Sequence, residues 1–257
     1  MNVINARLQF TGPGLRRGLA AKPWAILLVL SVICWVYFLV TASSSVAGHA
    51  HHHSGDNNNL HFFAGISAWL VMVYAMMLPL QSASLRYMLC MLPRYQHYNS
   101  LLLFIIGYSS VWLLIGLTLI FATQFSAAFF SSTRLAVPAL ALPIEAAVFL
   151  LAALYNQTPY RRQAVFACGG GLPLRINGWQ AAGDVLYFGV YKGRNCAASC
   201  LHVMLALVFA GHNLVMMAVV TLALFYERAR LPRETKIVSY LCYLASASYL
   251  FVWLYKV

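Results

Sequence analysis

Five histidines lie within a stretch of thirteen residues and are the first group of side chains here that could bind a metal. They are His49, His51, His52, His53 and His61. Imidazole binds copper, zinc, nickel and iron, and clustered imidazoles can collect an ion without a preformed site. The irregular spacing indicates capture of a metal rather than a rigid catalytic centre. The alternative interpretation is a polar connector with no ligand.

Methionines form the second group. Met72 and Met76 are four residues apart, and Met77 is adjacent. Residues at this spacing share one face of a helix, and two thioethers on one face can coordinate Cu(I). The alternative is ordinary packing, because methionine is an adaptable filler of apolar cores.

Cys196, Cys200 and Met204 form the third group, at two successive steps of four residues. They form one sulfur-bearing stripe if a helix begins before residue 196. Thiolates combined with a thioether favour Cu(I) over hard cations. The alternative is a pair of reduced thiols with no metal.

The elements that position these groups follow from the composition. Of 257 residues, 62% are hydrophobic and 9% are charged, whereas soluble proteins carry roughly 25% charged residues. Lipid must therefore solvate most of the surface. The sequence predicts an all-α, polytopic transmembrane bundle of about six helices, or five if the first is a cleaved signal.

Six apolar runs are the predicted spans, separated by polar segments. They cover residues 24–40, 62–80, 100–122, 135–155, 200–226 and 237–255. The pattern of the second continues helically to Met91, and the short apolar segment 185–191 is expected to lie at the interface or plug the core. We expect one transmembrane domain over 24–257, after a basic cytoplasmic tail over 1–23. Cleavage after Ala47 is the alternative.

Basic residues predict the orientation. With a cytoplasmic N-terminus, 12 of the 17 Lys and Arg residues lie inside, and the His-rich loop at 41–61 is external. The basic segment 227–236 opposes this topology. The net charge of +12 is expected to meet anionic lipid headgroups rather than nucleic acid.

Catalysis by the protein alone is not expected. The whole chain holds 5 Asp and Glu residues, which leaves few carboxylates for acid–base chemistry. Nucleotide-binding, serine-hydrolase and zinc-protease motifs are missing from it. An enzyme is expected only if a bound metal performs the chemistry.

Three segments resemble a family of uncharacterised bacterial proteins described as predicted metal-binding integral membrane proteins. They are Trp69 to Pro79, with Ala-Met-Met-Leu-Pro at its end, the turn Tyr155 to Arg162, and Cys200 to Glu227. The resemblance implies a metal site that includes Met76, Met77 and Cys200, in a bacterial inner membrane. The sequence departs from the family's motif at two places. Ser199-Cys200 stands where the family has two adjacent cysteines, and Asn213 lies one position earlier than the corresponding asparagine of the family.

The leading hypothesis is a membrane protein that binds, transports or otherwise handles a soft transition metal, copper first, with zinc, nickel or iron as alternatives. The alternative function is a non-transporting assembly or accessory subunit of a membrane metalloenzyme. The expected interaction partners are then another membrane protein or a second copy of this chain, besides the lipid bilayer and the metal.

Overall fold

The computed structural model describes residues 25–47, 58–133, 141–175, 179–210, 213–230 and 236–256. Within these ranges every regular element is a helix, so the predicted all-α fold is confirmed. The α-helices are α1 Ala25–Ala47, α2 Asn58–Met77, α3 Ser82–Met91, α4 His97–Thr133, α5 Ala141–Tyr155, α6 Pro159–Gly169, α7 Trp179–Phe209, α8 Leu214–Ala229 and α9 Ile237–Lys256. Short 3-10 helices lie at Pro79–Gln81 (η2) and Arg94–Gln96 (η3).

The second predicted span is broken at Pro79. Helical structure does continue to Met91, but its two halves are bent by 46°. Proline has no N–H, so the carbonyl of Ala75 receives no hydrogen bond from within its own helix. Ser31 Oγ donates to it at 2.8 Å and Trp35 Nε1 donates at 3.0 Å. Helix α1 therefore satisfies the carbonyl that the break leaves open.

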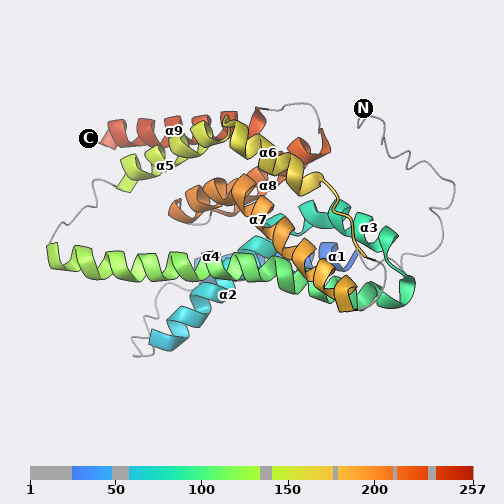
Figure 1. The fold of residues 1–257 in the computed structure, drawn as a ribbon. Helices are drawn as coiled ribbons and strands as arrows, with labels where there is room; N and C mark the ends of the chain where they lie inside the picture. Colours follow the sequence, from blue (N-terminus) through green and yellow to red (C-terminus); the bar gives the residue numbers. More distant parts are fainter. Residues whose placement is uncertain are drawn as a thin grey trace.

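Helices α4 and α7 form the most extensive contact in the described structure, and Figure 1 shows α7 crossing the long α4. Glycine permits this close crossing. A Cβ atom added to Gly107 would lie 2.4 Å from the carbonyl oxygen of Leu186, and one added to Gly189 would lie 2.5 Å from that of Phe104. Gly189 and Gly193 are four residues apart, the spacing at which small residues let helices in membranes approach closely.

Replacing Gly189 by alanine is expected to destabilise the protein by about 1–3 kcal/mol, because the methyl group must push two backbones apart. The matched control is Gly183→Ala on the same helix, where an added Cβ meets nothing within 4 Å. That change should be neutral or stabilising, since alanine favours helix by about 1 kcal/mol. Thermal unfolding in detergent measures both, and equal effects would contradict the close-packing explanation.

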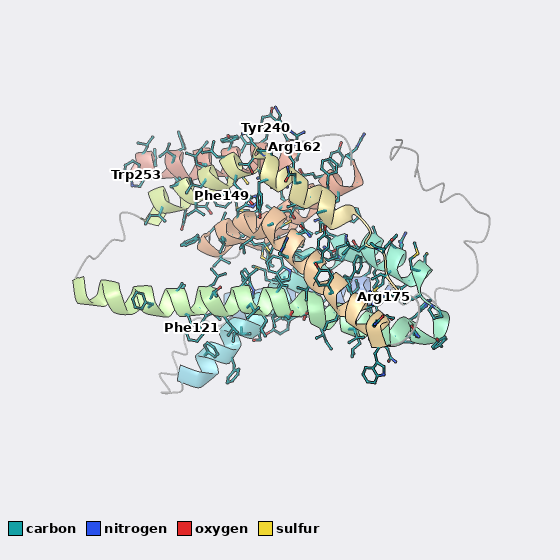
Figure 2. The ribbon with its side chains drawn as sticks, viewed as in Figure 1. Phe121, Phe149, Arg162, Arg175, Tyr240 and Trp253 are labelled. Atoms are coloured by element: carbon teal, nitrogen blue, oxygen red, sulfur yellow. The ribbon has the colours of Figure 1, made fainter. Side chains whose placement is uncertain are left out.

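Helices α5 and α9 lie side by side at another edge of the bundle (Figure 1). Phe149 of α5, labelled in Figure 2, stacks on Tyr249 of α9 with ring centres 5.7 Å apart. Ser246 Oγ donates a hydrogen bond to the carbonyl of Ala146 at 2.8 Å. These contacts join the fourth and sixth predicted spans.

In the described part of the chain, two helices are long and apolar enough to cross a membrane: His97–Thr123 within α4, and Ile237–Tyr255 within α9. The bent pair Phe62–Met77 and Pro79–Met91 would make a third. Shorter apolar helices cover Ala25–Thr41 and Ile144–Tyr155. Large apolar side chains project outward from both long helices, including Phe121 on α4 (64% exposed) and Phe251 on α9 (71% exposed). An apolar outer surface is what lipid solvates.

Several predicted boundaries were wrong, and local interactions explain some of them. The fifth predicted span is divided between α7 and α8, because the Asn213 side chain caps a new helix by accepting from the N–H groups of Val215 and Met216. Segment 185–191 belongs to the long α7 rather than forming a separate interfacial helix. The predicted polar loops at 41–61 and 123–134 are shorter, because α1 continues to Ala47 and α4 to Thr133.

Candidate metal centre

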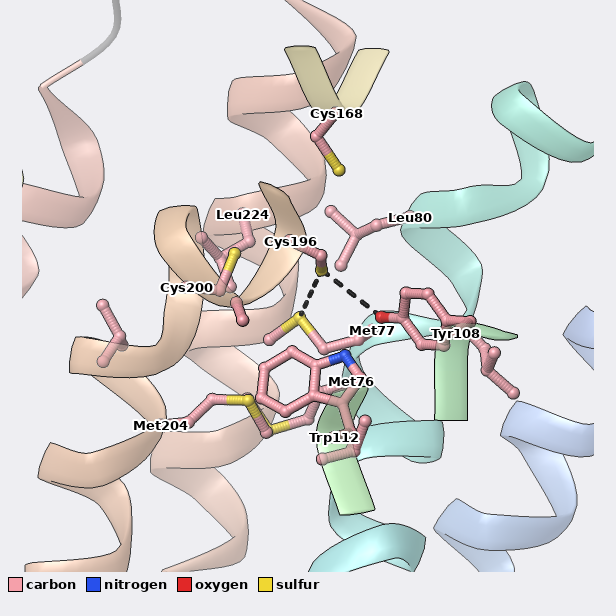
Figure 3. Packing of buried hydrophobic residues seen from close by; sticks show 14 of the residues in the cluster. Met76, Met77, Leu80, Tyr108, Trp112, Cys168, Cys196, Cys200, Met204 and Leu224 are labelled. Carbon is pink, nitrogen blue, oxygen red and sulfur yellow. Dashed lines mark hydrogen bonds between the residues drawn. The ribbon is translucent and has the colours of Figure 1, made fainter. Parts of the chain in front are cut away.

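Six sulfur-bearing side chains gather in the core, where α2, α6 and α7 meet (Figure 3). None is more than 2% exposed. We name this group the sulfur cluster; its members are Met76, Met77, Cys168, Cys196, Cys200 and Met204.

The local structure of two helices places most of these residues. Met76 and Met77 end α2, immediately before the break at Pro79. Helix α7 begins at Trp179, so Cys196, Cys200 and Met204 do follow one another on consecutive turns, as their spacing predicted.

Cys196 lies at the centre of the cluster. Its Sγ is 3.8 Å from Sδ of Met77, and Tyr108 Oη donates a hydrogen bond to it at 3.3 Å; both contacts are drawn in Figure 3. Metal–sulfur bonds measure about 2.3 Å, so two sulfurs that share one ion stand about 3.8–4.0 Å apart in tetrahedral or trigonal geometry. The Cys196–Met77 separation therefore fits a pair of ligands to one copper ion.

Each thiol of the cluster also has a polar neighbour. Gln81 Nε2 donates to Cys168 Sγ at 3.3 Å, and Ser199 Oγ lies 3.3 Å from Cys200 Sγ. The Tyr108 hydroxyl donates a hydrogen bond to Cys196 Sγ. Outer groups of this kind orient metal ligands and stabilise their anionic forms.

Cys168 is the member that the sequence analysis missed. It directly precedes a run of three glycines, a pattern typical of a turn, but it lies in α6, which ends at Gly169 and packs against α7. The available signal was the Thr158-Pro159 pair, since Thr158 caps α6 and Pro159 occupies its first turn. Read as a helix start, that pair places Cys168 on a helix rather than in a loop.

Lys192 fixes the end of α6 against α7. Its buried ammonium donates to the carbonyls of Ala167, Cys168 and Gly170. A cation at the carboxyl end of a helix satisfies carbonyls that have no partner within the helix. Burial lowers the pKa of Lys192, which lies outside the candidate spans, to about 8, although the nearby Cys168 opposes this change. The contact holds the Cys168 backbone beside the cluster.

A buried ion pair joins α6 to α8. The Arg161 guanidinium donates to both carboxylate oxygens of Glu227, at 2.5 and 2.6 Å, and its Nε donates to the carbonyl of Ser199 at 3.3 Å. Both side chains are nearly inaccessible. Arg161 therefore links α6 to α8 through Glu227 and to α7 through Ser199, the residue before Cys200.

The other predicted ligands are the five histidines and Met72. His49, His51, His52 and His53 lie outside the described residues, and His61 lies in the first turns of α2. Met72 is buried one turn before Met76. The structure thus brings together the methionine and cysteine groups, while the capture role of the histidines stays a prediction.

His202, a polar residue of α7, hydrogen-bonds to a neighbouring segment rather than to the sulfur cluster. Its Nε2 lies 2.9 Å from Oδ1 of Asn156, and its ring packs against Tyr155. A cavity of about 270 Å³ lies nearby, lined by α5, α8 and α9 residues that include Phe149, Met216 and Cys242, and it shares no residue with the cluster.

Across the described ranges, no three His, Cys, Asp or Glu side chains converge as a metal-binding group. A site built from the described residues would therefore combine thioethers with thiols. Donors of this kind suit Cu(I), which is soft and accepts few ligands. The residues present fit copper by donor type, burial and sulfur spacing.

The fold and the cluster define a helical membrane-type protein with a sulfur-rich interior suited to a soft metal. Comparison with known families agrees: residues 66–253 match the family described as PpoB2, copper chaperone. The chain belongs to that family. No curated protein and no solved structure gives a significant match.

Proposed function

We propose that this protein holds copper as Cu(I) in the sulfur cluster and delivers it to an acceptor, without catalysing a reaction. The observation that carries the proposal is the convergence of Met77 and Cys196, 3.8 Å apart and fully buried, inside a member of a copper chaperone family. The protein would lie in a bacterial inner membrane, with its N-terminus cytoplasmic and the His-rich segment outside. There the histidines would collect copper for the cluster.

Transport across the membrane is the second candidate function, and one feature favours it. The helix that carries Met76 and Met77 is broken by Pro79 at the level of the cluster. Broken helices at a central binding site are typical of transporters. Copper flux into liposomes that contain the purified protein separates the two functions: flux supports transport, and binding without flux supports delivery to a partner.

The direct test is metal analysis of the purified full-length protein before and after loading with Cu(I). We expect about one copper per chain in the wild type and loss of most of it in the triple variant Met76→Ala, Met77→Ala, Cys200→Ala. Met91→Ala and Cys90→Ser are matched controls, because both residues are exposed on α3. A wild type without stoichiometric copper, or a triple variant that retains it, would refute the proposal.

A further inference from the structure

An aromatic side chain, Trp112 of α4, lies beside the sulfur cluster. Tyr108, four residues earlier on the same face of α4, donates its hydroxyl to Cys196 Sγ at 3.3 Å, so this face of α4 is turned toward the cluster. Side chains of a helix incline toward its N-terminus, so the indole of Trp112 extends back toward the turn of Tyr108. Figure 3 shows this indole directed among the methionines of the sulfur cluster, with which it shares one hydrophobic core.

The surroundings of Trp112 hold its backbone but do not anchor its N–H group. The side chain is fully buried, and Trp69 Nε1 of α2 donates to the carbonyl of Trp112 at 2.9 Å. Trp112 Nε1 forms no hydrogen bond within the described structure, although it interacts with the Tyr108 hydroxyl. A buried indole N–H usually has an acceptor. A polar contact of the N–H group therefore does not explain why an indole occupies this position.

The aromatic ring of Trp112 has a use at a Cu(I) site. Two sulfur ligands such as Met77 and Cys196 leave open sides on the ion. A cation is attracted to the face of an aromatic ring, most strongly to that of tryptophan, and the attraction is largest where water is excluded. The ring of Tyr108, by contrast, stacks on Phe104 with ring centres 6.2 Å apart. Trp112 is thus the aromatic residue placed to cover an ion held by the sulfurs.

We propose that the indole ring of Trp112 covers the Cu(I) ion in the sulfur cluster and adds a cation–π contact to its sulfur ligands. This inference rests on the proposed function, because it needs the ion to bind beside Met77 and Cys196. The ring keeps water from the ion without adding a further strong ligand. Delivery to an acceptor requires that the ligands can be exchanged, and a cation–π contact opposes exchange less than another thiolate does.

The first measurement is the affinity for Ag(I), a redox-stable probe for the Cu(I) site, by competition titration of the full-length protein in detergent. Trp112→Leu should lower this affinity by about tenfold or more, because a desolvated cation–π contact is lost. Trp112→Phe removes the N–H and keeps a weaker aromatic ring, so it should retain a larger part of the affinity. Trp69→Phe is the matched control, since the two rings lie 6.0 Å apart in the same packing of α2 against α4, and it should bind Ag(I) nearly as the wild type does.

The second measurement is tryptophan fluorescence, which reports contact with the ion rather than folding. The chain has six tryptophans, and Trp179 at the start of α7 is 95% exposed. Saturating Ag(I) should quench the fluorescence of the wild type and, to the same extent, that of Trp179→Phe. Most of this quenching should be missing from Trp112→Phe.

Unchanged affinity in Trp112→Leu would overturn the inference, and so would equal losses in Trp112→Leu and Trp112→Phe, because the ring would then not be the group that matters. Full quenching in Trp112→Phe would also overturn it. If Trp112→Leu does not fold, the fluorescence of Trp112→Phe decides. A wild type that binds no Ag(I) contradicts the proposed function itself, whereas a wild type that binds Ag(I) without a change in fluorescence contradicts this inference alone.

Discussion

Replacing Cys196 by serine is expected to lower the affinity of the protein for Cu(I) by at least about 100-fold. Changes to groups that only support a metal ligand cost about 10–100-fold, so loss of a central ligand should cost more. Cys196 is the thiol that contacts both Met77 and Tyr108 and lies among Cys168 and Cys200. A hydroxyl oxygen is a hard donor and does not replace a thiolate for Cu(I). Competition against a Cu(I) chelator with a known affinity measures the change.

Serine is the appropriate replacement at this position because it retains a partner for the Tyr108 hydroxyl and so preserves the fold. Cys90→Ser is the control, since Cys90 is exposed on α3 and should bind copper as the wild type does. Equal melting temperatures for the three proteins would show that the bundle is intact. An unchanged Cu(I) affinity in Cys196→Ser would remove the sulfur cluster from consideration as the copper site.

The second large effect is expected from Glu227→Gln, which should destabilise the protein by about 3–5 kcal/mol, because it leaves the Arg161 guanidinium buried without a counter-charge. The two side chains are 5% and 9% exposed, so solvent cannot take over the role of the carboxylate. Denaturant unfolding in detergent measures the loss.

The exposed pair Arg175–Asp184 provides the control for Glu227→Gln. Its atoms are 3.8 Å apart and Arg175 is largely exposed, so Asp184→Asn should cost at most about 1 kcal/mol. Replacing both Arg161 and Glu227 by methionine should cost less than Glu227→Gln alone, since no charge is then stranded. Similar losses in the buried and the exposed pair would contradict this account.

Local patterns predicted the helical fold and the sulfur stripe of α7, because hydrophobicity and a spacing of four residues are properties of neighbouring residues. The meeting of Met77 with Cys196 was not predictable in this way, since 119 residues separate them. Cys168 was missed because its position depends on how α6 folds back on α7. The division between α7 and α8 was missed because the apolar runs on either side of Asn213 were interpreted as one span, whereas the Asn213 side chain caps a new helix.

The resemblance segments gain a physical meaning from the fold. The basic turn that follows Thr158-Pro159 and the glutamate that closes the cysteine-bearing segment are the two partners of the Arg161–Glu227 pair. Arg161 also holds the carbonyl of Ser199, which precedes Cys200. The Arg161–Glu227 ion pair thus joins two of the three segments beside the sulfur cluster. The third segment supplies Met76 and Met77 to the cluster.

The Ala75 carbonyl has a mechanical consequence for the cluster. It is held from outside its own helix, by Ser31 and Trp35 of α1, and Met76 and Met77 follow it directly in the chain. A tilt or slide of α1 would therefore pull the last turn of α2 with it and change the distance between the thioethers and Cys196. Helix α1 supplies none of the six sulfurs, yet its two hydrogen bonds to Ala75 tie its position to the geometry of the proposed copper site.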